Sequence, residues 1–138
     1  MVTLITGKNG EGKTKKLIEL TNAALENSSG SIIVIDKGSK LNFDISYKIR
    51  LVDTKRYNVD GVETLYGFVC GVCASNYDAT DIFIESALEI CGNSVDEFGK
   101  FVGKINELSD KTNINITISV STDKSDISDD LRSICNIL

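Results

Sequence analysis

The residues best suited to chemistry form the run Gly7 to Thr14, which reads GKNGEGKT. The run fits G-x-x-x-x-G-K-[ST], the spacing of a phosphate-binding loop (P-loop), without a mismatch. Glycines let the backbone wrap around a phosphate with its N–H groups pointing inward, and the following helix adds a positive dipole end. An apolar segment precedes the run and an amphipathic segment follows it. The spacing therefore predicts a site for a nucleotide triphosphate, and Mg-ATP is the expected ligand.

Individual positions of the loop have distinct expected roles. Lys13 is expected to reach the β- and γ-phosphates, and the Thr14 hydroxyl is expected to ligate Mg²⁺. Further contacts to the nucleotide are expected from the rest of the run and from the first turn of the helix, namely Gly7, Lys8, Asn9, Gly10, Glu11, Gly12 and Lys15.

The lysines around Lys13 also allow simpler interpretations. Lys8 stands where partition-type ATPases carry an extra lysine that contacts a phosphate across a dimer, although Asn9 replaces the glycine of that motif. The alternative is a solvated loop lysine. Lys15 and Lys16 crowd a helix start, where the helix dipole disfavours cations. A bound polyphosphate would relieve that conflict, and the alternative is that both side chains extend into solvent.

A second group of candidate residues follows later apolar segments. The segment 81–85, Asp-Ile-Phe-Ile-Glu, looks like a Walker B strand, which ends in a carboxylate that holds Mg²⁺ through water. Glu85 is therefore a predicted metal-side residue and, with Lys13, a predicted catalytic residue; the alternative is a surface acid. Ser86 stands where many ATPases carry a catalytic glutamate. Ser119 and Ser121 are expected near the γ-phosphate if their strand lies beside the first one.

Two further motifs are expected to have structural roles. Asp123 to Asp126 is similar to the guanine-reading N-K-x-D of GTPases, but aspartate at the first position removes the asparagine amide. These acids are expected to cap the final helix, and a GTPase is the alternative. Cys70 and Cys73 form a C-x-x-C without a second pair and without any histidine in the chain. They are expected to be structural, although four-cysteine zinc coordination is possible in principle.

The elements that would position these residues follow from hydrophobic periodicity. Short apolar runs alternate with amphipathic helices, which is typical of a mainly parallel sheet with helices on both faces. Strands are expected at 2–6, 32–36, 47–52, 81–85 and 115–121, and helices at 13–26, after capping boxes formed by Asp60 with Glu63 and by Ser94 with Glu97, and near Ile127. The segment 37–46 is too short for a crossover helix, so an extended loop or a hairpin is expected there.

Composition limits the class of protein. The chain has 138 residues, of which 41% are apolar, so one domain covering 1–138 with a real core is expected. A net charge of -5 gives no support for nucleic acid as a partner. The apolar runs are too short to span a membrane, and no signal peptide is recognisable. A cytoplasmic location with reduced cysteines is therefore expected.

The stretches VTLITGKNGEGKTKKLIEL, SIIVIDK, DIFIES and ISVSTDK, taken in order, resemble a family of short bacterial P-loop ATP-binding proteins. Members of that family are single domains of similar length, loosely labelled as ATPases or twitching-motility proteins. The resemblance implies a three-layer α/β P-loop domain with about five strands. In the RecA-like order expected here, the strand 115–121 lies between the first strand and the strand 81–85. A kinase-like order is the alternative.

Three functional hypotheses remain open from the sequence. The first is a weak ATPase, activated by a protein partner or by another copy of the chain that supplies an arginine. The second is a nucleotide-sensing regulatory module without hydrolysis. The third is a small-molecule kinase, which usually needs a lid and an acceptor pocket with arginines. Arg50, Arg56 and Arg132 are scattered along the chain, so the kinase ranks last.

Overall fold

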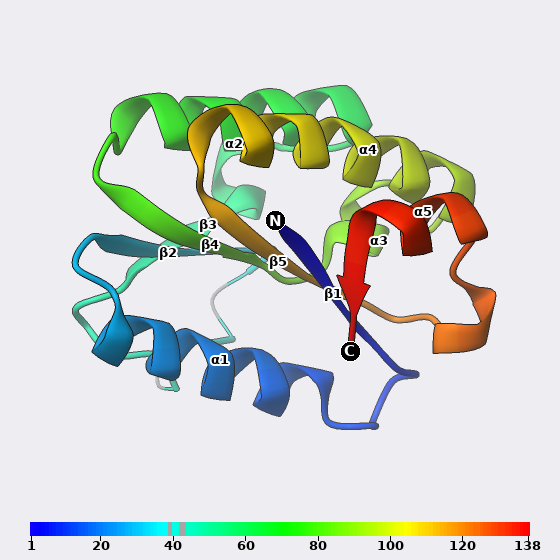
Figure 1. Ribbon diagram of the computed structural model, residues 1–138, viewed down its shortest axis with the longest axis horizontal. Helices are drawn as coiled ribbons and strands as arrows, with labels where there is room; N and C mark the ends of the chain where they lie inside the picture. The colour runs from blue at the N-terminus through cyan, green and yellow to red at the C-terminus, as the bar shows by residue number, and fades with distance from the viewer. Residues whose placement is uncertain (39, 42–43) are drawn as a thin grey trace.

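The computed structural model describes residues 1–38, 40–41 and 44–138, and a parallel sheet lies at its centre (Figure 1). Within these residues the sheet has six strands in the order β3-β2-β4-β5-β1-β6, and all neighbouring strands run parallel. The strands are β1 (Val2–Thr6), β2 (Ser31–Asp36), β3 (Arg50–Asp53), β4 (Ala79–Ile84), β5 (Asn115–Val120) and β6 (Cys135–Ile137).

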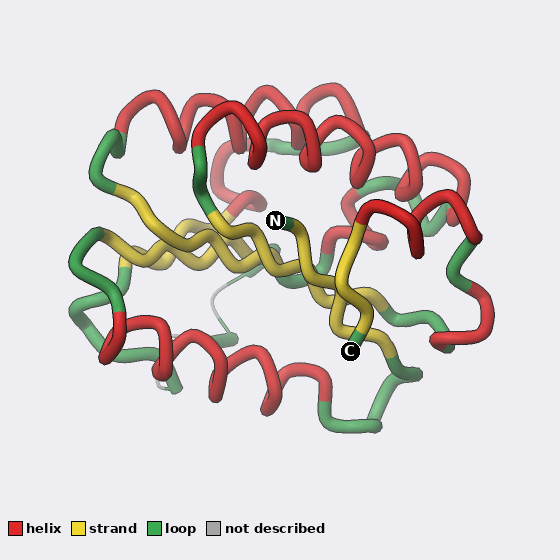
Figure 2. Tube along the Cα trace, viewed as in Figure 1, coloured by secondary structure: helices red, strands yellow, loops and turns green. Residues whose placement is uncertain are grey.

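Helices cover both faces of this sheet. α1 (Lys13–Asn27) lies on one face, and α2 (Val62–Ser75) and α4 (Val95–Thr112) lie side by side on the other (Figures 1 and 2). The remaining helical elements are the short helices α3 (Ala87–Ile90) and α5 (Asp129–Ile134), and the 3-10 turns η1 (Thr54–Tyr57) and η2 (Lys124–Asp126). The expected three-layer α/β architecture is confirmed. No helix among the described residues is long and apolar enough to cross a membrane.

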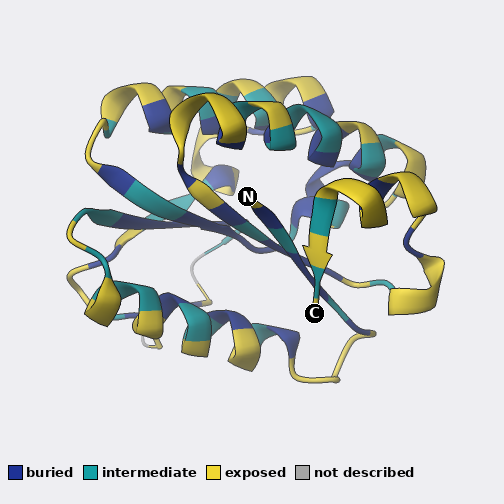
Figure 3. Cartoon of the chain, in the orientation of Figure 1, coloured by how far each residue is buried: buried dark blue, intermediate teal, exposed yellow. Residues whose placement is uncertain are grey.

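The core divides into two clusters, one on each side of the sheet, and the central strands are the most deeply buried part of the molecule (Figure 3). Phe98 and Phe101 of α4 fill the larger cluster, between the sheet and the α2–α4 layer. Leu17 of α1 and Phe83 of β4 pack in the smaller one. Because β2 and β4 are covered on both faces, their continuous apolar runs have no polar side, as expected for central parallel strands.

The strand order follows the RecA-like expectation. β5 lies between β1 and β4, with Leu4 opposite Ile118 and Ile84 also opposite Ile118. The kinase-like alternative, with β4 beside β1, is not found. A sixth strand was not expected, because the three residues of β6 are too few to give a periodic signal. β6 pairs with the free edge of β1, and the backbone N–H of Leu138 donates to the Leu4 carbonyl at 2.8 Å.

The strand expected at 47–52 is wrong in its first half. β3 begins at Arg50, Tyr47 is 92% exposed, and the Ile49 N–H donates to the Ser46 carbonyl in a turn. Ile49 is buried nonetheless, in the cluster beside α1. The alternation in this segment therefore reflects burial of a loop side chain and not strand pairing.

The hairpin that the sequence allowed before β3 is not found. β3 is parallel to β2, so a hairpin across 37–46 is excluded; positions 39 and 42–43 of that segment lie outside the described residues.

Of the two predicted capping boxes, the one formed by Asp60 is wrong, because α2 starts after Gly61 without a side-chain cap and Glu63 instead pairs with Lys104 at 2.7 Å. The capping box of Ser94 is confirmed in its first half, since Ser94 Oγ accepts from the Glu97 N–H at 3.2 Å.

Candidate functional site

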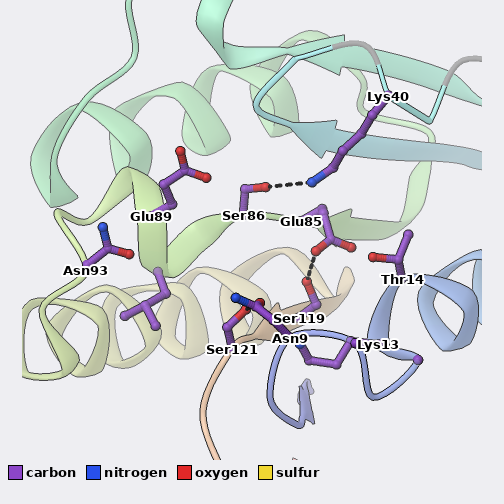
Figure 4. A pocket seen from close by; sticks show the side chains of 13 residues that line it. Asn9, Lys13, Thr14, Lys40, Glu85, Ser86, Glu89, Asn93, Ser119 and Ser121 are labelled. Atoms are coloured by element: carbon purple, nitrogen blue, oxygen red, sulfur yellow. Dashed lines mark hydrogen bonds between the residues drawn. The ribbon is translucent and has the colours of Figure 1, made fainter.

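A cavity of about 670 Å³ opens at the carboxyl ends of β1, β4 and β5 (Figure 4). This is the edge at which open parallel sheets bind ligands. The described residues that line it come from the loop after β1, from the ends of β4 and β5, and from the connection after β2: Asn9, Gly10, Gly12, Lys13, Thr14, Lys40, Glu85, Ser86, Leu88, Glu89, Asn93, Ser119 and Ser121.

The Gly7–Thr14 loop forms one wall of the cavity. Gly12 precedes α1 with φ 86°, a left-handed conformation that a side chain would strain, and an added Cβ there would meet nothing within 4 Å. The Gly7 N–H donates to the Thr122 carbonyl at 2.8 Å, which ties the start of the loop to the segment after β5. Lys13 is only 8% exposed, and its ammonium donates to the Lys8 carbonyl at 2.9 Å. The loop thus holds a buried cation at the edge of the cavity.

Glu85 and Thr14 both bring side-chain oxygens to the cavity, and oxygen is the ligand type that Mg²⁺ prefers. Glu85 is 6% exposed, its Oε1 accepts from the Ser119 hydroxyl at 2.7 Å, and its Oε2 is buried without a partner. Mg²⁺ is usually held by one or two protein carboxylates together with substrate phosphates and water. The described residues contain no group of three or more His, Cys, Asp or Glu placed to hold a metal. The unpartnered Oε2 fits such an ion.

The other loop residues divide between two sides of the loop. Asn9 and Ser121 lie together in the cavity, where the Ser121 hydroxyl donates to Asn9 Oδ1 at 3.0 Å. Glu11 and Lys15 line a separate hollow of about 440 Å³. Lys8 is exposed, and it contributes its backbone carbonyl to the loop.

The opposite wall contains a group that the sequence did not place together. Asp36, at the end of β2, is fully buried, and its Oδ1 accepts from the Ser86 hydroxyl at 3.0 Å and from the Lys37 N–H at 2.7 Å. Its Oδ2 is buried without a partner. Lys40 Nζ approaches Ser86 Oγ at 3.5 Å from the cavity side (Figure 4). Ser86 thus connects a buried carboxylate to a cation in the cavity.

The electrostatic balance of this wall is dominated by burial. Burial raises the pKa of Asp36 above its usual range, and nearby Glu85 raises it slightly further. Lys40 and the hydrogen bonds from Ser86 and Lys37 act in the opposite direction. The wall therefore favours a proton or a cation beside Asp36.

The cavity contains one further acid, Glu89, and its described lining includes no arginine. Glu89 lines the cavity and forms an ion pair with Lys37 at 3.2 Å. No arginine is among the described residues that line it; the Arg132 Nε, for example, donates to the Ile127 carbonyl at 3.0 Å near α5.

Sequence reasoning missed two residues that line the cavity, Lys40 and Asn93, since both lie in connections without periodicity. Their one available signal was position, shortly after a strand end or a short helix.

The two motifs assigned structural roles occupy structural places. Asp123 accepts from the Ser125 N–H and so caps η2, whereas Ser128 caps α5. The expectation that these acids cap the final helix is therefore wrong, because Asp123 caps the 3-10 turn η2 and the final helix, α5, has Ser128 as its cap. Cys73 is buried on the inner side of α2, and its thiol and that of Cys70 are free.

A scan against protein-family models and a search of curated proteins found no match to this chain.

Proposed function

We propose that this protein binds Mg-ATP at the Gly7–Thr14 loop and is a weak ATPase that a partner activates. One observation carries the proposal: the loop holds the buried Lys13 ammonium at a cavity that Thr14 and Glu85 also line. A buried lysine usually needs an anion. Its present partner is a neutral carbonyl, so a phosphate would supply the missing negative charge.

Each residue of the site has a part in this proposal. The Lys13 ammonium and the N–H groups of the glycine-rich loop bind the β- and γ-phosphates. The Thr14 hydroxyl and Glu85 Oε2 hold Mg²⁺, which would neutralise phosphate charge when bound. Ser119 orients the Glu85 carboxylate through its hydrogen bond at 2.7 Å. The preference for adenine rests on the family resemblance and on Asp123, which stands where guanine-reading proteins carry an asparagine.

Weak intrinsic hydrolysis follows from what the cavity supplies. Hydrolysis needs a positioned water, a base and charge stabilisation at the γ-phosphate. Glu85 is committed to the metal, and the hydroxyl of Ser86 is a poor base near neutral pH. With no arginine among the described lining residues, a second copy of the chain or another protein would have to supply one. The cytoplasm, where Mg-ATP is abundant and thiols stay reduced, is the proposed location.

Thermal unfolding in the presence of nucleotides tests the binding step. At a ligand concentration one hundred times Kd, binding adds about 2.7 kcal/mol to the free energy of unfolding, or roughly 10 °C in Tm for a domain of this size. Mg-ATP is expected to give this increase and Mg-GTP a smaller one. Lys13→Ala should remove most of it. Glu85→Gln should remove the part that depends on Mg²⁺.

Lys16→Ala is the matched control, because it removes the same charge from an exposed position in the same helix. This variant should keep the full increase. An equal increase in wild type and Lys13→Ala would contradict the role of Lys13. The lack of any increase in wild type would overturn the proposed function.

A further inference from the structure

Ser86 occupies an unusual backbone position at the wall of the cavity. It follows β4 after one intervening residue, Glu85, and directly precedes α3, with φ 66° and ψ 19°, the left-handed region that favours glycine. For a residue with a side chain this conformation costs roughly 1–2 kcal/mol. Strain of this kind gathers at active sites, where it fixes the direction of a side chain.

The Ser86 hydroxyl is directed at a base. It donates to Asp36 Oδ1 at 3.0 Å, and Asp36 is fully buried with its other oxygen unpartnered. A hydroxyl in hydrogen-bond reach of a carboxylate that a third group orients is the arrangement of an activated nucleophile. The Lys37 N–H, at 2.7 Å from the same Asp36 oxygen, is that third group.

The same hydroxyl also faces a cation within the proposed nucleotide site. Lys40 Nζ lies 3.5 Å from Ser86 Oγ, and both residues line the cavity that Lys13 and Thr14 line from the other side (Figure 4). A lysine in this position would stabilise negative charge on a phosphate between the two walls. Ser86 and Lys40 thus present a nucleophile and a charge stabiliser to one space, and Asp36 lies fully buried behind Ser86 as its base.

We propose that Ser86 accepts the γ-phosphoryl group of the bound nucleotide, with Asp36 as the base; this inference rests on the proposed function. Ser86 Oγ forms a bond to the γ-phosphorus, and the bond from that phosphorus to the oxygen bridging the β-phosphate breaks. The electron pair of the broken bond leaves with the nucleoside diphosphate, and the Ser86 proton passes to Asp36 Oδ1. The products are phosphoserine and a nucleoside diphosphate.

The modification would also act on the site itself. A phosphoserine carries a charge of about -1.5 to -2 at neutral pH. On Ser86 that charge lies beside Glu85 and Asp36, so a second Mg-ATP would bind more weakly. The reaction is therefore expected to stop after one turnover per chain.

Intact-mass measurement of the full chain after incubation with Mg-ATP tests the proposal. One phosphoryl group per chain is expected, located on Ser86 by peptide fragmentation. Ser86→Ala and Ser86→Gly should take up none; glycine adopts the positive φ without strain, which protects this test from a folding defect. Asp36→Asn should slow the transfer about a hundredfold or more. Ser133→Ala, at an exposed position of α5, is the control and should be modified like wild type.

Thermal shifts recorded on the same samples separate the two proposals. If Mg-ATP stabilises wild type and no phosphoryl group appears, the acceptor role of Ser86 is overturned and the binding function stands. Modification that persists in Ser86→Gly overturns it equally. If Mg-ATP neither stabilises nor modifies wild type, the proposed function fails first.

Discussion

The two walls of the cavity are built in different ways. The wall that carries Lys13 and Thr14 is one uninterrupted run of the chain, from the end of β1 to the first turn of α1. The opposite wall joins Asp36, Ser86 and Lys40, which come from the end of β2, the end of β4 and the connection after β2. The first wall needs correct local geometry, whereas the second needs β2 and β4 to be neighbours in the sheet.

The walls also differ in how their charges are satisfied. The loop wall, which is the Gly7–Thr14 run, pairs its buried cation with a backbone carbonyl, and Gly10 and Gly12 at positive φ leave room for a ligand. The strand wall is the opposite one, at the ends of β2 and β4. It leaves one oxygen each of Asp36 and Glu85 buried without a partner. Lys13 and Lys40 therefore suit an anion, and the unpartnered Glu85 oxygen suits a cation, which is the charge pattern that a metal-bound polyphosphate would complete.

The largest expected effect tests whether the strand wall lacks what fast hydrolysis needs. A monomeric sample is expected to release phosphate far more slowly than about one turnover per second, because an arginine supplied in trans is worth about a thousandfold or more. Steady-state phosphate release, measured across a wide range of protein concentration, should rise per chain only on assembly. Turnover of one per second or faster in a strictly monomeric sample would show that the cavity is complete by itself.

A pair of glycine substitutions separates damage to the fold from damage to the loop wall. A Cβ at Gly30 would run into the Asp78 carbonyl oxygen and lie 2.6 Å from Thr80 Cγ2, so Gly30→Ala should lower the free energy of unfolding by about 1–3 kcal/mol. Gly12→Ala meets no atom and should lose only about 1 kcal/mol through its positive φ. Denaturant unfolding with and without Mg-ATP measures both effects.

Of the two variants, Gly12→Ala should lose less free energy of unfolding but more of the stabilisation by Mg-ATP. Gly30 precedes β2, at the end of that strand away from the cavity, so its alanine variant should keep the stabilisation by Mg-ATP. Gly12→Ala should reduce that stabilisation. Equal reduction in both variants would mean that ligand binding follows global stability, and the distinction between the walls would lose its basis.

The smallest expected effect is the pH dependence of the contribution that Asp36, in the strand wall, makes to the free energy of unfolding. Burial raises the pKa of Asp36 in the folded state, so the folded protein retains a proton that the unfolded chain loses near pH 3.8. Asp36 therefore contributes stability below that pH, and this contribution is lost as the pH rises through the raised pKa. The free energy of unfolding of wild type minus that of Asp36→Asn should fall over this range. A difference that increases with pH, in nucleotide-free denaturant titrations, would contradict the sign.

Much of the fold could be predicted because its elements are periodic. The helices beginning at Lys13 and Val95 and the buried strands β2 and β4 carry strong local patterns, and the observed elements match them closely. The prediction failed where local pattern and burial separate. Ile49 is buried from a turn, Gly61 replaces the expected cap at the start of α2, and β6 is too short to show a period.

The sequence by itself determined the loop wall, because the Gly7–Thr14 loop is made of consecutive residues whose backbone preferences and charge are legible in order. It also placed Glu85 at the carboxyl end of an apolar strand, although β4 itself ends one residue earlier, at Ile84. Only the tertiary structure decided that Asp36 lies beside Ser86, that Lys40 reaches the same cavity, and that Ser119 orients Glu85. These contacts join residues far apart in the chain, and pairing between parallel strands, which no local pattern encodes, brings them together.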